Sequence, residues 1–284
     1  MEGGFGLQEL RKSLRDALHH AGTESPAACA DQILMHVLHL DKTQLLLGRN
    51  EVSADDSETA YAMAKRRIGG EPMQYILGHC LFMDLDFVVN RSTLIPRPET
   101  ELLVETVLGV LPKEKKINVW DIGSGSGCIG ISLAHYNPNI SVAAIDCSAA
   151  ALEVTALNAK RCGVDARMTT LCLDIMKDMP DVKTPDVIVS NPPYIRRDVI
   201  GALQREVRDF EPMAALDGGA DGLDFYRRIV SDAPLQSGGL LAFEIGYDQG
   251  GAVAALMERQ GFLQVTVKKD YADLDRIVFG YRKS

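Results

Sequence analysis

From about residue 116 to its end, the chain alternates short apolar, β-branched segments with longer amphipathic ones. This alternation is typical of strands connected by helices, the way a parallel sheet covered on both faces is built. Strands are expected at Ile117–Asp121, Ser141–Asp146, Met168–Asp174, Asp186–Ser190, Leu240–Ile245, Leu263–Lys269 and Arg276–Arg282. Helices are expected at Cys128–Tyr136, Ala149–Cys162, Leu223–Ala233 and Gly250–Gln260. The pattern predicts an α/β domain.

The last two expected strands break the alternation, because only the short segment Tyr271–Asp275 separates them. A parallel connection needs a crossover of about a dozen or more residues. These two strands are therefore predicted to form an antiparallel hairpin at one edge of the sheet.

The first 70 residues carry helix signals and no strand signal. Leucines recur at helical spacing between Leu7 and Leu18, and Ser25-Pro26 is a typical helix start. A second apolar stripe follows over residues 27–38, then a short helix over Asp41–Leu47 and a fourth helix over Ser57–Ile68. Residues 1–73 are predicted to form a small all-α domain.

Residues 74–98 change character. Gln74–Gly78 and Leu81–Val89 carry aromatic and β-branched side chains with partial alternation, which favours a short β-hairpin linking two domains. Pro96 and Pro98 then hold the chain extended, so a helix can begin only near Glu99 and is expected to run to Leu111. The sheet domain is thus expected to cover residues 99–284.

Charge and hydropathy limit the function classes. The 30 basic and 39 acidic residues give a net charge of −9, whereas proteins that bind duplex nucleic acid usually present a basic surface. No stretch reaches the ~18 apolar residues of a membrane span, and the first residues do not form a signal peptide. The six cysteines include no C-x-x-C pair. We expect a cytoplasmic monomer without metal, stable nucleic-acid partner or membrane attachment.

A glycine-rich turn follows the first strand of the sheet, with the sequence Gly123-Ser124-Gly125-Ser126-Gly127. Glycines let the backbone approach a ligand closely, and the helix that follows offers free N–H groups. Asp146 ends the next strand and can accept hydrogen bonds from both hydroxyls of a ribose. The turn and the acid together predict a nucleoside cofactor.

Two cofactor classes fit this turn. Gly125, Gly127 and Gly130 satisfy G-x-G-x-x-G, so an NAD(P)-dependent oxidoreductase stays open as an alternative. Asp121 favours the other class, because its carboxylate would repel a pyrophosphate but is tolerated beside the amino group of a methionine moiety. The turn therefore favours S-adenosylmethionine over NAD.

The segment Asn191-Pro192-Pro193-Tyr194 follows the fourth strand, which places Asn191 at the carboxyl end of the sheet. The side-chain oxygen of Asn191 and the carbonyl of Pro192 can accept both hydrogens of a planar –NH₂ group, and Tyr194 can stack on that group. Orienting reactants in this way can save roughly 7–11 kcal/mol of the barrier. The motif predicts methyl transfer to an amide or exocyclic amine, with Asn191, Pro192 and Tyr194 as catalytic residues.

These motifs resemble those of S-adenosylmethionine-dependent amino-methyltransferases, and one family in particular. The release factor glutamine methyltransferases (the HemK family) have segments similar to Leu94–Glu101, Gln74–Gly78, the spaced Phe82, Leu85 and Phe87, and Asp221-Gly222-Leu223 before Tyr226. The resemblance covers nearly the whole chain and is most specific over residues 74–101 and 119–194.

The resemblance implies a Rossmann-like, seven-stranded methyltransferase sheet behind a helical domain that recognises the substrate. It also implies methyl transfer from S-adenosylmethionine to N5 of the glutamine in the Gly-Gly-Gln motif of class-1 peptide chain release factors. With Asp121 from the charge argument, the expected cofactor contacts are Gly123, Ser124, Gly125, Ser126, Gly127, Asp146, Asp174, Ile175 and Asn191. The expected substrate contacts are Asn191, Pro192, Pro193, Tyr194, Arg97 and Glu99.

Some of these residues, and two features near them, either depart from the family pattern or allow a second role. Ile175 stands where the family often has an aromatic residue, so apolar packing on an adenine is expected with less stacking. Arg97 and Glu99 either shape the substrate entrance or form an ion pair that braces the linker. The loop Asp217–Gly222 is either a substrate wall or a plain connection, and Glu244 is expected to be a structural acid.

Two other functions stay open beside the oxidoreductase. A nucleic-acid adenine N6 methyltransferase would use the same tetrapeptide, because adenine N6 is also a planar –NH₂, but it should carry a basic groove and a target-reading insertion that are not evident here. A non-catalytic binder could retain the fold without turnover.

Overall fold

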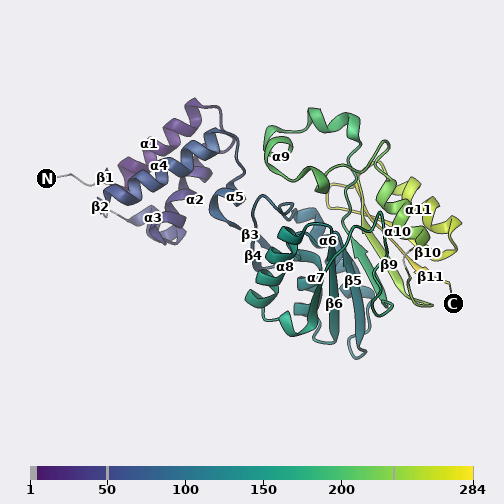
Figure 1. The fold of residues 1–284 in the computed structure, drawn as a ribbon. Helices are drawn as coiled ribbons and strands as arrows, with labels where there is room; N and C mark the ends of the chain where they lie inside the picture. Colours follow the sequence, from purple (N-terminus) through teal and green to yellow (C-terminus); the bar gives the residue numbers. More distant parts are fainter. Residues whose placement is uncertain (1–4, 49–50, 233, 284) are drawn as a thin grey trace. The chain divides into compact units, whose positions relative to one another are not determined.

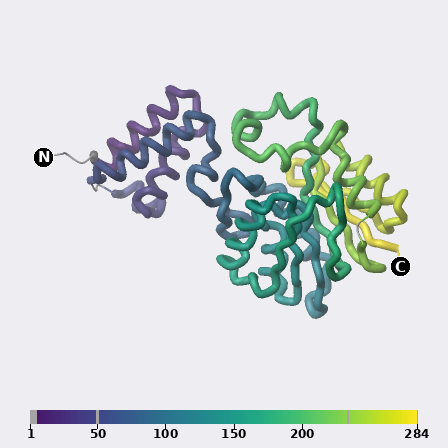
Figure 2. Tube along the Cα trace, in the orientation of Figure 1, coloured from purple at the N-terminus to yellow at the C-terminus, as the bar shows by residue number. Residues whose placement is uncertain are grey.

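The computed structural model describes residues 5–48, 51–232 and 234–283 (Figure 1). The chain divides into two compact units. The first contains the residues up to Gly78 together with Arg205–Phe210, and the second contains His79–Gln204 and the chain from Glu211 onward. In Figure 2 the first unit is mostly the purple-to-blue part of the trace. Within the described residues, no helix is long and apolar enough to cross a membrane.

The first unit is mainly helical, as predicted. Its helices are α1 (Leu7–His20), α2 (Pro26–Leu38), α3 (Lys42–Leu47), α4 (Ala54–Ile68), α5 (Met73–Leu77) and α9 (Arg205–Phe210). The leucine stripe of α1 is fully buried against Ala30, Ile33 and Leu34 of α2, which forms one apolar core. α4 begins three residues before the predicted Ser57, because Ser53 caps it by accepting a hydrogen bond from the Asp56 N–H at 3.1 Å.

The expectation of no strand in this region is wrong. Two short strands, β1 (Phe5–Gly6) and β2 (Glu51–Val52), pair antiparallel, with Phe5 opposite Val52. A strand of two residues has no periodicity to detect, and this pair forms only because the helical core brings distant segments together.

The predicted hairpin exists, but its first strand is misplaced. Gln74–Gly78 lies in α5, which Gly78 terminates in a left-handed conformation with φ of 80°. The hairpin instead pairs β3 (His79–Phe82) with β4 (Leu85–Val88) through the two-residue turn Met83-Asp84, where both φ angles are positive. A helix of five residues is too short to show a helical period, so its aromatic and β-branched composition indicated a strand.

The second unit contains a seven-stranded sheet in the order β10-β11-β9-β8-β5-β6-β7. The strands are β5 (Ile117–Ile122), β6 (Ile140–Asp146), β7 (Met168–Cys172), β8 (Val187–Ser190), β9 (Leu240–Glu244), β10 (Phe262–Lys269) and β11 (Asp275–Arg282). β5 to β9 run parallel, whereas β11 is antiparallel to both β9 and β10. The predicted Rossmann-like sheet and its antiparallel terminal hairpin are confirmed, each strand within two residues of its expected bounds.

Five longer helices cover the sheet: α6 (Pro98–Val110), α7 (Cys128–Tyr136), α8 (Ala149–Arg161), α10 (Asp224–Asp232) and α11 (Gly250–Arg259). Successive strand residues point to opposite faces, so Val119 and Ala242 join one apolar core with α6 and α7. Trp120 and Leu241 join a second core with α10 and α11. The four helices expected in this part of the chain and the helix after Pro98 are therefore confirmed.

The strand order reverses at β5, which has β6 on one side and β8 on the other. Ligands of open α/β sheets bind at the carboxyl ends of strands at such a point. The turn after β5 and the motif after β8 both start there. Between β8 and α10 the chain also forms the short 3₁₀ helices η2 (Arg197–Ala202) and η3 (Met213–Ala215), which the sequence did not indicate.

Candidate active site

A cavity of about 670 Å³ lies at the carboxyl ends of the central strands. Small-molecule sites usually occupy about 300–1,000 Å³, so this cavity has the size of a cofactor site. Four segments that follow strands contribute to its wall, and they bring together eight of the expected site residues: Gly123, Gly125, Asp146, Asp174, Ile175, Asn191, Pro192 and Pro193. Residues that the sequence did not assign to the site complete the wall: Ser92, Thr93, Leu94, Cys147, Ser148, Leu173, Met176, Pro212, Met213, Ala214, Ala215 and Phe225. Of these, Leu94 alone belongs to a segment that resembles the family, Leu94–Glu101.

Gly125 and Gly127 of the turn are glycines for different structural reasons. Gly127 caps α7 with φ of 82°, and a Cβ there would lie 2.7 Å from Ile131 Cδ1 and 2.8 Å from Thr155 Cγ2. Gly127 is therefore required for packing and does not line the cavity. Gly125 also has a positive φ, 55°, but apart from the adjoining residues of the chain, a Cβ there would have no protein atom within 4 Å. Its missing side chain leaves room at the cavity wall instead.

Asp146 lies where β6 ends and its carboxylate is held in place from two sides. Oδ2 accepts a hydrogen bond from the Gly125 N–H at 2.9 Å, and Oδ1 accepts one from the Ser148 N–H at 2.9 Å. An ionised carboxylate has about four acceptor positions, so acceptor capacity remains on the cavity side. This arrangement fits the hydroxyls of a ribose beside the glycine turn.

Asp121 does not line the cavity. It is fully buried under the turn, where Oδ2 accepts a hydrogen bond from the Gly130 N–H at 2.9 Å. Its other oxygen, Oδ1, has no hydrogen-bond partner among the described residues. Burial raises the pKa of Asp121 to about 7, although the hydrogen bond from Gly130 acts in the opposite direction. A contact between Asp121 and an amino group of the cofactor stays a prediction.

Replacing Asp121 with asparagine is expected to change how stability depends on pH. Between pH values of about 4 and 7, unfolded Asp121 releases its proton while folded Asp121 keeps it, so wild-type stability declines over this range and levels off above it. The variant lacks this decline. Its free energy of unfolding minus that of the wild type should rise by about 3 kcal/mol from about pH 4 to 7 in urea titrations. A difference independent of pH would contradict the raised pKa.

The tetrapeptide after β8 reaches the cavity with its first three residues. Asn191 donates from Nδ2 to the Thr100 hydroxyl at 3.3 Å, and Pro192 is buried. Tyr194 does not line the cavity, and its side chain packs against the core that contains Trp120. Burial raises the pKa of the Tyr194 hydroxyl to about 12, so this group stays protonated at neutral pH. Stacking of its ring on a substrate stays a prediction.

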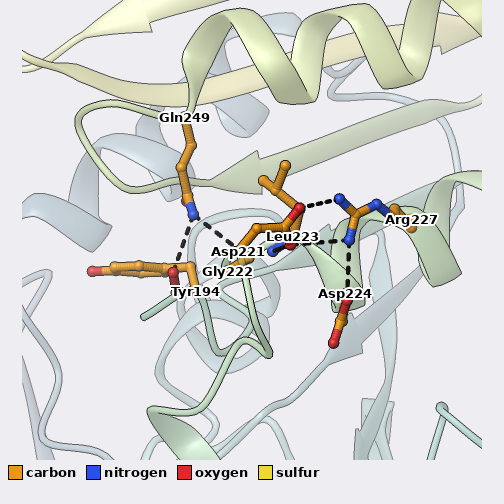
Figure 3. A network of polar contacts seen from close by, with 7 residues as sticks. All are labelled: Tyr194, Asp221, Gly222, Leu223, Asp224, Arg227 and Gln249. Carbon is orange, nitrogen blue, oxygen red and sulfur yellow. Dashed lines mark hydrogen bonds and ion pairs between the residues drawn. The ribbon is translucent and has the colours of Figure 1, made fainter. Parts of the chain in front are cut away.

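Gln249 holds the backbone of the Asn191–Tyr194 motif in place through its side-chain amide. Its Nε2 donates to the Tyr194 carbonyl at 3.1 Å and to the Gly222 carbonyl at 3.2 Å (Figure 3). Gly218 lies so close that a Cβ there would be 2.7 Å from the Pro193 carbonyl oxygen. The loop Asp217–Gly222 therefore packs on the motif, and Asp217 contributes to the cavity wall.

Arg97 and Glu99 do not line the cavity. The Arg97 guanidinium forms an ion pair with Glu211, whose side chain is almost fully buried. The second Glu211 oxygen accepts a hydrogen bond from the Ile95 N–H at 3.1 Å. The ion pair that braces this segment thus joins Arg97 to Glu211, whereas Glu99 is exposed. Because 114 positions separate Arg97 from Glu211, no local pattern indicated the pair.

Ser124 and Ser126 are buried within the turn and do not line the cavity either. Asp174 lies two residues past the end of β7, where an ion pair with Lys177 at 3.1 Å lowers its pKa. Among the described residues, no group of three or more His, Cys, Asp or Glu side chains is placed to hold a metal ion.

Comparison with known proteins agrees with this architecture. The family model described as the PrmC N-terminal domain matches residues 9–78, and the one described as the methyltransferase small domain matches residues 98–206. A methyltransferase structure from Pyrococcus furiosus, 17% identical, has a TM-score of 0.52 and is aligned over 72% of this chain and 91% of its own, which shows a shared fold.

Two curated relatives are similar over almost their full lengths. A release factor glutamine methyltransferase of Moorella thermoacetica is 42% identical over 281 residues, covering 96% of this chain and 99% of the relative. A protein of the same description from Clostridium acetobutylicum is 39% identical over 254 residues, covering 88% and 89%. Identity of this degree over nearly whole chains means that the chain belongs to the release factor glutamine methyltransferase family.

Proposed function

We propose that this protein transfers a methyl group from S-adenosylmethionine to the side-chain amide nitrogen of the glutamine in the Gly-Gly-Gln motif of class-1 release factors. The observation that carries the proposal is one cavity whose wall contains both Asp146, beside the glycine turn, and Asn191 with Pro192, after β8. Membership of the family supports the same activity.

The chain's residues fit the cofactor by size, charge and polarity. Asp146 has free acceptor capacity for the ribose hydroxyls, and Gly125 leaves room for the ligand beside them. Leu173 and the buried Ile175 give an apolar wall suited to a purine ring. When bound, S-adenosylmethionine supplies the methyl group on a positively charged sulfur, which leaves without needing an acid.

On the substrate side, the chain's task is to hold and aim a carboxamide. The Asn191 side-chain oxygen and the Pro192 carbonyl accept the two hydrogens of the glutamine –NH₂ group, which keeps the nitrogen fixed toward the methyl donor. No residue has to remove a proton before attack, because the nitrogen can release its extra proton after the new bond forms. The Tyr194 hydroxyl, with its pKa near 12, is not a base at neutral pH.

Mass spectrometry of a purified class-1 release factor, incubated with the protein and S-adenosylmethionine, tests the proposal. One added methyl group on the glutamine of the Gly-Gly-Gln peptide is expected, and none on a release factor in which that glutamine is replaced by alanine. Parallel incubations contain DNA or RNA and labelled cofactor. Label on nucleic acid alone would instead favour adenine N6 methylation.

Calorimetry with S-adenosylhomocysteine and with NAD separates the methyltransferase from the oxidoreductase alternative. Binding of S-adenosylhomocysteine and not of NAD is expected, because Asn191 and Pro192 share the cavity wall with Asp146 and would have no role in an oxidoreductase. Tight binding of NAD alone would contradict the proposed cofactor. A monomeric state, a cytoplasmic location and the absence of nucleic-acid or membrane partners stay predictions.

A further inference from the structure

Glu244 is a buried acid beside the active-site motif for which the proposed reaction has no use. It is the last residue of β9 and is 1% exposed. In the parallel pairing of β8 with β9, Ser190 lies opposite Phe243, so Glu244 lies one position further, next to Asn191. Phe243 and Ile245 pack into the core formed with α10 and α11. Since strand residues alternate, Glu244 points to the other face, which α6 covers.

Thr100, in the first turn of α6, connects Glu244 to Asn191. Its side chain is 2% exposed, and its hydroxyl oxygen accepts the 3.3 Å hydrogen bond from Asn191 Nδ2. Burial raises the pKa of Glu244 to about 7, whereas the neighbouring polar side chains of Thr100 and Asn191 and the charge of Arg276 act in the opposite direction. The nitrogen side of the Asn191 amide therefore faces a hydroxyl and a carboxyl group.

The direction of these hydrogen bonds determines what Asn191 offers a substrate. An asparagine amide has an acceptor on one side and two donors on the other. A hydroxyl alone does not select between them, because it can donate or accept. A carboxylate oxygen only accepts, so a Thr100 hydroxyl that donates toward Glu244 is left to accept from Asn191, which is the direction of the 3.3 Å hydrogen bond. Oε2 of Glu244 has no hydrogen-bond partner among the described residues. This oxygen can therefore be protonated without changing the direction of the hydrogen bond from Asn191 to Thr100.

We propose that Glu244 and Thr100 are positioning residues that hold the nitrogen side of the Asn191 amide, so that its oxygen faces the substrate. This inference rests on the proposed function, in which that oxygen accepts a hydrogen of the glutamine –NH₂ group. A reversed amide would place donors against donors and would hold the substrate nitrogen away from the methyl donor.

Three substitutions test the arrangement. Glu244→Gln keeps the shape of the side chain but adds a donor, Thr100→Val removes the hydroxyl, and Thr100→Ser restores it. The first two are expected to lower kcat for release factor methylation about 10-fold or more. Their dissociation constants for S-adenosylhomocysteine should stay within about twofold of wild type, and Thr100→Ser should retain most of the activity.

Thr106→Val is the matched control, since Thr106 is a buried threonine on the same helix whose hydroxyl donates to the Leu102 carbonyl at 2.6 Å. It should leave kcat within about twofold of wild type. A double-mutant cycle then identifies the target: Glu244→Gln should have no further effect in an Asn191→Ala background. Equal losses in both backgrounds, or equal losses in Thr100→Val and Thr106→Val, would overturn the inference.

The side-chain amide resonances of Asn191 decide the inference independently of turnover. They are assigned by their disappearance in Asn191→Ala, in ¹⁵N-labelled protein without substrate. Both proton shifts are expected to move in Glu244→Gln and Thr100→Val and to stay in place in Thr106→Val. Unmoved resonances in the first two variants overturn the positioning role, whereas a wild-type protein that does not methylate release factor overturns the proposed function.

Discussion

Asn191→Ala is expected to lower kcat for release factor methylation about 10²–10³-fold, the size of effect seen when one aligned hydrogen-bonding group is removed from a reacting centre. The variant loses the oxygen that accepts from the substrate amide, and it keeps Asp146 and the glycine turn in the cavity wall. Its dissociation constant for S-adenosylhomocysteine should therefore stay within about threefold of wild type.

Single-turnover assays with release factor measure the chemical step, and calorimetry measures cofactor binding on the same preparation. Asn139→Ala is the control, because Asn139 donates to the Lys113 carbonyl at 2.8 Å and does not line the cavity. It should retain activity within about twofold of wild type. Normal turnover in Asn191→Ala would remove the mechanism, and loss of cofactor binding would assign Asn191 to the cofactor instead.

Gly125→Ala is expected to weaken binding of S-adenosylhomocysteine about 10- to 100-fold, which corresponds to the roughly 1–3 kcal/mol that overpacking usually costs. Apart from the adjoining residues of the chain, the new methyl group meets no protein atom within 4 Å, so it would project from the cavity wall into the room that a ligand needs. Folding should suffer only the roughly 1–2 kcal/mol of placing a non-glycine residue at positive φ.

Gly163→Ala separates these two effects. Gly163 has φ of 69°, and a methyl group added there would, as at Gly125, have no protein atom within 4 Å apart from the adjoining residues of the chain. Gly163 does not line the cavity. Both variants should lose similar amounts of stability in urea titrations, and only Gly125→Ala should lose cofactor affinity. Equal affinities in the two variants would mean that the turn does not contact the cofactor.

The chain between β8 and α10 shows how one segment can serve both units. Asn191–Pro193, Pro212–Ala215 and Asp217 lie in the unit with the sheet and line its cavity. The six residues Arg205–Phe210 between them belong to the helical unit, where Glu206 forms an ion pair with the nearly buried Arg67 at 2.5 Å. The wall of the cavity is thus continuous in sequence with a helix of the other unit.

Local periodicity was enough to predict the sheet, its helices and its terminal hairpin, because each of these elements is long enough to show its own repeat. The sequence also indicated the cavity residues that follow directly from strand ends, such as Gly125, Asp146 and Asn191, since parallel strands bring their carboxyl ends to one edge. The sequence did not indicate the short elements α5, β1 and β2. The five residues of α5 make fewer than one and a half helical turns, and the two residues of each strand cover a single strand repeat, so neither length shows a periodic pattern.

Which members of each motif face the cavity became clear only from the packing of the folded chain. Asp121 and Gly127 lie within four residues of Gly125 in the chain, yet Asp121 is buried under the turn and Gly127 lies against Ile131 and Thr155. The partners of Arg97 and Asn191 are Glu211 and Thr100, 114 and 91 positions away in the chain. Such contacts depend on how strands and helices pack in three dimensions, so they cannot be predicted from the local spacing of residues in the sequence.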